Sequence, residues 1–147
     1  MSGINRVVLD ASVLVAFMRP GEPSHFRANA LIEELTLKPS PLFIPAIALA
    51  EVAAALARGE NDTERALNAV KWLSQLRGLK TVSVDEKLGR LAVQIAARQR
   101  IRGCDAVYVA LARRMGVPLI TLDRQQRERA STVVRAYTPT EALVRFG

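Results

Sequence analysis

The chain has 147 residues, a formal net charge of +7 and a hydrophobic content of 50%. This length suits one domain with a substantial core, and the apolar content is too high for a disordered chain, so we expect a single domain over residues 1–147. The first apolar run is too short to span a membrane and lacks the frame of a signal peptide. The one cysteine, Cys104, cannot form an internal disulfide, which fits a cytoplasmic location.

The first half of the chain alternates short apolar runs with helical patterns. Runs of apolar and β-branched residues predict strands, whereas apolar positions three and four residues apart predict helices, especially between caps and helix breakers. In chain order these signals predict a strand at 6–9, a helix at 11–18, a helix at about 24–38, a strand at 42–44, a helix at about 45–58 and a helix that ends near 76.

Two of these helices carry specific signals at their ends. Pro45 suits the first turn of the third helix, and Gly59 suits its close. The fourth helix has two candidate caps, Asn61 and Asp62. Asn61 has Glu64 three residues later, which resembles a capping box, whereas Asp62 has no acid at that spacing.

The second half continues the alternation of strands and helices. It predicts a strand at 80–84, a helix at 85–100, a helix at 103–115, a strand at 117–122, a short strand at 133–136 and a terminal helix that Pro139 and Glu141 open. Strands that alternate with helices indicate an α/β protein. We therefore expect a three-layer α/β/α sandwich around a mostly parallel central sheet.

Aspartates follow three of the predicted strands. Asp10, Asp85 and Asp123 each end an apolar run, in RVVLD, KTVSVD and PLITLD. Because the carboxyl ends of parallel strands meet at one edge of a sheet, where binding sites form, these residues are site candidates. A strand-end aspartate is also a common N-cap of the next helix, so each of them taken alone can be explained by capping.

Two further acids lie on helices that are expected in the core. Glu51 belongs to PAIALAEVAAALA, which is apolar on nearly every face, so its charge needs a partner or a cation unless it lies on a narrow stripe facing solvent. Asp105 opens the apolar helix CDAVYVALA. An acid in a first turn is favoured by the helix dipole, but the burial expected of this helix also brings Asp105 close to the edge of the sheet.

Carboxylates without nitrogen or sulfur ligands indicate a hard metal ion. His25 is the only histidine, and the sequence contains no cysteine cluster, Gly-rich phosphate loop or serine triad. Clustered carboxylates repel one another unless a cation joins them, and all-oxygen ligands suit Mg²⁺ or Mn²⁺. Such ions activate water and stabilise phosphoryl oxygens. An acidic metal site within a basic protein is the charge pattern expected of a nuclease.

Three stretches, VVLDASVLVAF, PAIALAEVAAAL and GCDAVYVALARRMGVPLITLD, resemble a known family. In this order they are similar to the motifs of PIN-domain ribonucleases, close to the VapC-like toxins of type II toxin–antitoxin pairs. The resemblance implies a Mg²⁺- or Mn²⁺-dependent endoribonuclease that forms a homodimer and binds an antitoxin. It also implies a set of catalytic metal-binding acids and a supporting hydroxyl: Asp10, Glu51, Asp105, Asp123 and Ser12.

Within that set, Glu51 is either a ligand or the group that orients the attacking water. Asp85 has no counterpart among the ligands of the family, so we interpret it as a cap. Many relatives carry another acid shortly after the last motif aspartate, whereas this chain offers Gln125 there.

Six arginines flank the late motifs and are expected to rim the groove and hold the RNA backbone: Arg98, Arg100, Arg102, Arg124, Arg127 and Arg129. These arginines could instead be ordinary exposed side chains or contacts for an antitoxin.

For the whole chain, the alternative is a non-catalytic PIN-like module that binds RNA or a protein. The complete set of four carboxylates argues against it. A receiver or phosphatase of similar topology would need a close acidic neighbour for its nucleophilic aspartate and a strand-end lysine, which are not found.

Overall fold

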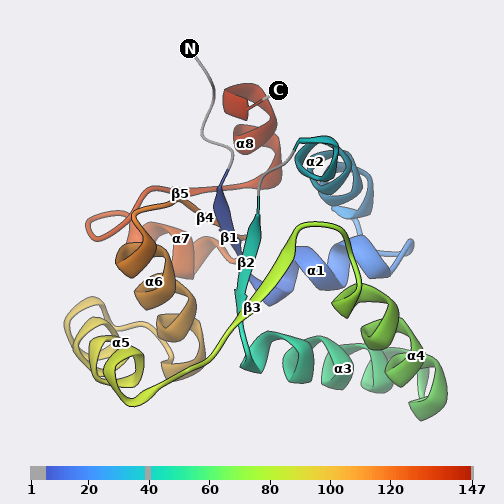
Figure 1. The fold of residues 1–147 in the computed structure, drawn as a ribbon, viewed down its shortest axis with the longest axis horizontal. Helices are drawn as coiled ribbons and strands as arrows, with labels where there is room; N and C mark the ends of the chain where they lie inside the picture. Colours follow the sequence, from blue (N-terminus) through green and yellow to red (C-terminus); the bar gives the residue numbers. More distant parts are fainter. Residues whose placement is uncertain (1–5, 39–40, 147) are drawn as a thin grey trace.

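The computed structural model describes residues 6–38 and 41–146, and within these ranges the chain forms five strands and eight helices (Figure 1). The strands form one sheet in the order β3-β2-β1-β4-β5, and each neighbouring pair is parallel. The strands are β1 (Val7–Leu9), β2 (Leu42–Pro45), β3 (Leu79–Val82), β4 (Leu119–Ile120) and β5 (Ala136–Tyr137).

Helices cover the sheet on both sides. They are α1 (Ala11–Met18), α2 (His25–Leu37), α3 (Ile47–Glu60), α4 (Thr63–Ser74), α5 (Glu86–Gln99), α6 (Gly103–Met115), α7 (Arg124–Ala130) and α8 (Pro139–Phe146). In Figure 1, α5 and α6 lie on one side of the central strands, and α1 to α4 lie on the other. The predicted three-layer sandwich around a parallel sheet is therefore confirmed.

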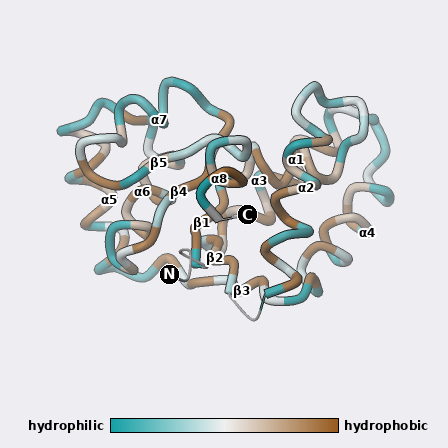
Figure 2. The backbone as a smooth tube through the Cα atoms, turned by 90° about the horizontal axis from the view of Figure 1, so that it is seen from above, coloured by the Kyte–Doolittle hydropathy of each residue, from teal (hydrophilic) through white to brown (hydrophobic). Residues whose placement is uncertain are grey.

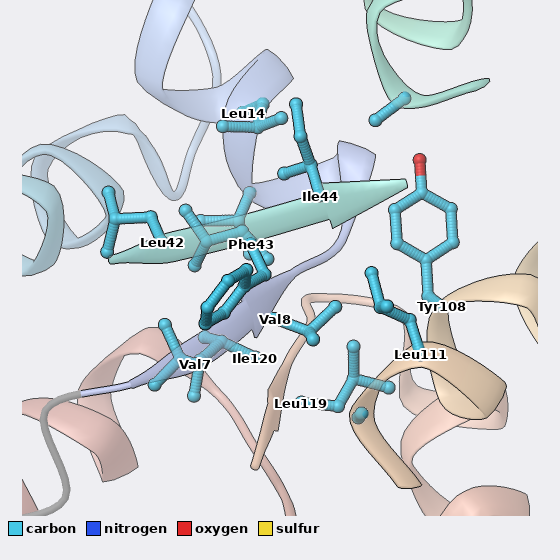
Figure 3. Close-up of a cluster of buried hydrophobic side chains, with 14 of the residues drawn as sticks. Val7, Val8, Leu14, Leu42, Phe43, Ile44, Tyr108, Leu111, Leu119 and Ile120 are labelled. Atoms are coloured by element: carbon cyan, nitrogen blue, oxygen red, sulfur yellow. The ribbon is translucent and has the colours of Figure 1, made fainter. Parts of the chain in front are cut away.

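The core explains why the central strands are apolar throughout. Every residue of β1, β2 and β4 is buried, because helices cover both faces of these strands. Figure 3 shows side chains of the central strands packed with Leu14 of α1 and with Tyr108 and Leu111 of α6. The edge strand β3 is only partly buried.

The third helix begins and ends later than the sequence indicated. Pro45 belongs to β2 and pairs with Val82, and the N–H of Ala46 still donates to the carbonyl of Val82, so the strand continues past the proline. Gly59 lies inside α3, which ends at Asn61 in the left-handed conformation (φ 52°). The predictions of a helix start at Pro45 and a helix end at Gly59 were therefore wrong.

The cap of α4 is Asp62. Its side chain accepts a hydrogen bond from the N–H of Arg65 at 3.1 Å. Asn61 cannot serve as this cap because it closes α3, where its N–H donates to the carbonyl of Ala57 at 2.8 Å. Asparagine tolerates the left-handed conformation better than most residues, which explains its place at a helix end.

The region after Asp123 differs most from the sequence interpretation. The helix α7 was not expected, and β5 lies at Ala136–Tyr137 instead of 133–136. The N–H groups of Val133 and Val134 both donate to the carbonyl of Ala130, so these valines close a turn after α7 and do not begin a strand. Among the described residues, no helix is long and apolar enough to cross a membrane.

Candidate active site

Asp10 is a buried carboxylate at the end of β1, with a residue exposure of 5%. Its Oδ2 accepts a hydrogen bond from the N–H of Ser12 at 3.0 Å and lies 3.2 Å from Oγ1 of Thr121. Its Oδ1 accepts from Nε2 of Gln126 at 3.3 Å. Burial raises the pKa of Asp10, and the hydrogen bonds from Ser12 and Gln126 oppose this rise. Asp10 therefore caps α1 and also belongs to a buried polar network.

Two hydroxyls join the ends of β1 and β4. Oγ of Ser12 accepts from the N–H of Leu122 at 3.0 Å and lies 3.4 Å from Oγ1 of Thr121. Oγ1 of Thr121 accepts from the N–H of Asp123 at 3.0 Å. These contacts hold the strand ends that carry Asp10 and Asp123 beside each other.

Arg102 brings Asp105 and Asp123 together. Its Nη2 lies 3.0 Å from Oδ2 of Asp105 and 3.3 Å from Oδ2 of Asp123. The second oxygen of Asp123, Oδ1, accepts from the N–H of Gln126 and caps α7. Burial raises the pKa of Asp105, and Arg102 opposes this rise. The two carboxylates thus already hold one cationic group between them.

Glu51 is partly exposed and also has a partner inside the protein. Its Oε1 accepts a hydrogen bond from the hydroxyl of Tyr108 at 2.5 Å. Tyr108 is fully buried on α6, and Figure 3 shows its hydroxyl at the far end of the ring from that helix. Burial, reinforced by Glu51, raises the pKa of Tyr108, so the hydroxyl stays protonated and remains a donor.

The donor set suits a hard divalent cation in its chemistry. Asp10 and Asp105 lie close enough for each negative charge to disfavour the other, as do Asp105 and Asp123. All the candidate ligand atoms are carboxylate oxygens, which Mg²⁺ and Mn²⁺ prefer. In the described part of the chain, however, no three acidic, histidine or cysteine side chains are grouped closely enough to hold a metal ion. A metal ion bound by Asp105 and Asp123 would replace the guanidinium of Arg102.

Asp85 lies apart from these residues. It caps α5 by accepting from the N–H of Leu88 at 2.8 Å, and it also pairs with Arg114 at 3.3 Å. The hydrogen bond from Leu88 is the main cause that lowers the pKa of Asp85. The interpretation of Asp85 as a cap is confirmed.

The six arginines differ in their contacts. Arg102 alone among them has a hydrogen bond or ion pair to a candidate acid in the described structure. The others have local contacts: Arg98 donates to Gln94, Arg124 pairs with Glu128, Arg127 lies near Glu128 and Glu141, and Arg129 donates to the carbonyl of Arg100. Their predicted role in RNA binding stays a prediction.

Three residues that contact the candidate acids were not expected from the sequence: Tyr108, Thr121 and Gln126. Each lies near a motif acid in the sequence, since Tyr108 comes three residues after Asp105, and Thr121 and Gln126 flank Asp123. Gln125 stands where many relatives carry another acid, but it is exposed, and the buried amide belongs to Gln126.

Comparison with known proteins identifies the fold and the family. The PIN domain profile matches residues 7–131, so the chain belongs to the PIN domain family. No curated protein sequence matches the chain.

Solved structures with the same fold include toxins and toxin–antitoxin complexes. VapC20 of Mycobacterium tuberculosis, a sarcin–ricin loop cleaving toxin, is 21% identical with a TM-score of 0.69, over 82% of this chain and 92% of that one. FitAcB of Neisseria gonorrhoeae is 21% identical with a TM-score of 0.71, and the match covers 91% of this chain and 98% of that one. VapBC2 of Rickettsia felis, solved with a DNA fragment from the promoter, is 16% identical with a TM-score of 0.68. That match covers 90% of this chain and 98% of the other.

Proposed function

We propose that this protein is a metal-dependent endoribonuclease and the toxin of a toxin–antitoxin pair. The observation that carries the proposal is a set of contacts that links three acids from the ends of two strands and the start of α6. Arg102 joins Asp105 to Asp123, and Gln126 joins the carboxylate of Asp10 to the main-chain carbonyl of Asp105. Membership of the PIN domain family and the fold shared with VapC20 support a nuclease that acts on RNA.

In the proposed site, Asp10, Asp105 and Asp123 hold Mg²⁺ or Mn²⁺, and Glu51 is either a further ligand or the group that orients the attacking water. The bound ion supplies an activated water and offsets negative charge on the phosphoryl group. The protein positions its own groups before RNA binds: Ser12 donates its N–H to Asp10, and Tyr108 donates its hydroxyl to Glu51.

Arg102 has the best placement to contact the substrate. It is exposed and lies at the carboxylates, so once it leaves Asp105 and Asp123 its guanidinium can bind a phosphate of the RNA. The other five arginines would extend this contact along the RNA backbone.

An antitoxin partner and a homodimer belong to the same proposal. The toxin–antitoxin complexes among the structural neighbours support the antitoxin.

The test is cleavage of a single-stranded RNA with Mg²⁺, with excess EDTA, and with Mg²⁺ restored after EDTA. We expect endonucleolytic products with Mg²⁺, none in EDTA and recovery on restoration. Undiminished cleavage in EDTA would contradict metal dependence. RNA binding without cleavage at any Mg²⁺ or Mn²⁺ concentration would favour the non-catalytic module.

A further inference from the structure

Gln126 is a buried polar residue that contacts two of the elements that carry the candidate acids. Its exposure is 2%, and it lies on α7. Its Nε2 lies 3.3 Å from Oδ1 of Asp10 and 3.2 Å from the main-chain carbonyl oxygen of Asp105. We infer that Gln126 is a positioning residue that fixes the carboxylate of Asp10 relative to the start of α6. This inference rests on the metal site of the proposed function.

The orientation of the amide is set by the two acceptors that it faces. Oδ1 of Asp10 and the main-chain oxygen of Asp105 both need a donor, so the NH₂ group faces them, and Oε1 lies 2.7 Å from the hydroxyl of Thr121. The NH₂ group has two hydrogens, and each has one acceptor. Within the described residues, no buried side-chain nitrogen or oxygen lacks a hydrogen-bond partner, so each buried polar atom of this network has at least one.

The neutral charge of Gln126 is part of its role. A carboxylate at this place would face Oδ1 of Asp10 and the carbonyl of Asp105 without a hydrogen to donate, and it would add a negative charge to a group of acids that already repel. The amide instead donates to both acceptors. A hydrogen bond of this kind orients a ligand carboxylate, and loss of such a contact typically lowers metal affinity about 10- to 100-fold.

The experiment compares Gln126→Met with Gln125→Met. Methionine has nearly the length of glutamine and no amide, so Gln126→Met fills the same space and removes both donated hydrogen bonds. Gln125 is the exposed neighbour on the same helix and provides the matched control. Mn²⁺ affinity is measured by calorimetry on the folded proteins, and kcat and KM are measured on a single-stranded RNA.

We expect Gln126→Met to bind Mn²⁺ about 10- to 100-fold more weakly and to lose kcat, with little change in KM for the RNA. Gln125→Met should match the parent in all three quantities. Unchanged Mn²⁺ affinity in folded Gln126→Met would overturn the inference, because a side chain that only supports packing would leave affinity intact.

If Gln126→Met does not fold, Gln126→Leu replaces it, since leucine is shorter and also lacks polar atoms. If neither variant folds, Gln126 is required for folding and the inference is wrong. The proposed function is tested separately by the parent protein. A parent that binds no Mn²⁺ overturns both statements, whereas a parent that binds Mn²⁺ without cleaving RNA overturns only the nuclease.

Discussion

At the scale of single residues, the same carboxylates cap helices and form part of the candidate site. Asp10 and Asp123 each accept an N–H at the start of a helix, as Asp85 does. Their neighbours distinguish them, since Asp10 lies in a buried network with Thr121 and Gln126, whereas Asp85 is exposed beside Arg114. The sequence identified all three aspartates, but the spacing of residues along one strand cannot reveal contacts between elements.

Asp10→Asn should separate these two roles. Asparagine caps a helix about as well as aspartate, and the substitution removes a buried charge but turns an NH₂ group toward Nε2 of Gln126. These effects oppose each other, so the metal-free variant should stay folded and melt close to the temperature of the parent. The rise in melting temperature that Mg²⁺ gives the parent should disappear, because a metal that binds the native state stabilises it. Thermal melts with and without Mg²⁺ provide the measurement. Asp85→Asn is the control and should keep the full rise, and a full rise in Asp10→Asn would exclude Asp10 as a ligand.

Tyr108→Phe tests whether Glu51 depends on its hydroxyl partner. The change removes only the donor to Glu51, so we expect the free energy of unfolding to fall by about 1–2 kcal/mol. A double-mutant cycle with Glu51→Ala in urea measures the coupling directly, and Glu51→Ala should cost less stability in the Tyr108→Phe protein. A coupling energy near zero would show that the two side chains do not stabilise each other.

At the scale of elements, apolar periodicity predicted the order of strands and helices well, because most of them bury an apolar face. The helix α1 has the expected bounds, and α6 also matches. The helix α7 was missed because its sequence, RQQRERA, has no apolar stripe and is set by the cap Asp123 and the contacts of Gln126. The end of α3 was misplaced because the left-handed residue is Asn61 and the chain continues as helix through Gly59.

Arg102 lies in the connection between α5 and α6. Removing its side chain should have opposite effects on the binding of Mn²⁺ and of RNA. Arg102→Ala removes the cation that Asp105 and Asp123 share, so Mn²⁺ should bind about two- to fivefold more tightly, the scale of one exposed ion pair. RNA of any sequence should bind more weakly. The salt dependence of RNA affinity should also fall by about one released counterion. Calorimetry and filter binding at several salt concentrations measure these effects.

Arg90→Ala is the matched control for this prediction. Arg90 is also exposed and also pairs with an acid, Glu86, but it lies within α5 and not at the candidate site. It removes the same charge from the molecule, so it should leave Mn²⁺ affinity unchanged. Equal effects of the two variants would mean that only net charge matters.

At the scale of the whole molecule, a basic protein carries an acidic centre. A net charge of +7 favours the binding of a polyanion. Arg102 and Gln126 link Asp10, Asp105 and Asp123 at the ends of β1 and β4 and the start of α6. Figure 2 shows a mainly hydrophilic chain along α7, directly after the last of these acids. This arrangement fits the proposed binding of RNA across an acidic site. The single domain, the homodimer and the antitoxin partner stay predictions.

The most direct test of this account is the single-turnover rate of RNA cleavage by the parent and by Asp105→Asn at saturating Mg²⁺. In the described structure the side chain of Asp105 bonds to Arg102 and caps no helix, so its substitution should leave the fold intact. We predict a loss of at least about 100-fold, equivalent to roughly 2.7 kcal/mol in the barrier, with a far-ultraviolet spectrum like that of the parent. An undiminished rate in folded Asp105→Asn would contradict the claim that Asp10, Asp105 and Asp123 hold a metal ion required for RNA cleavage.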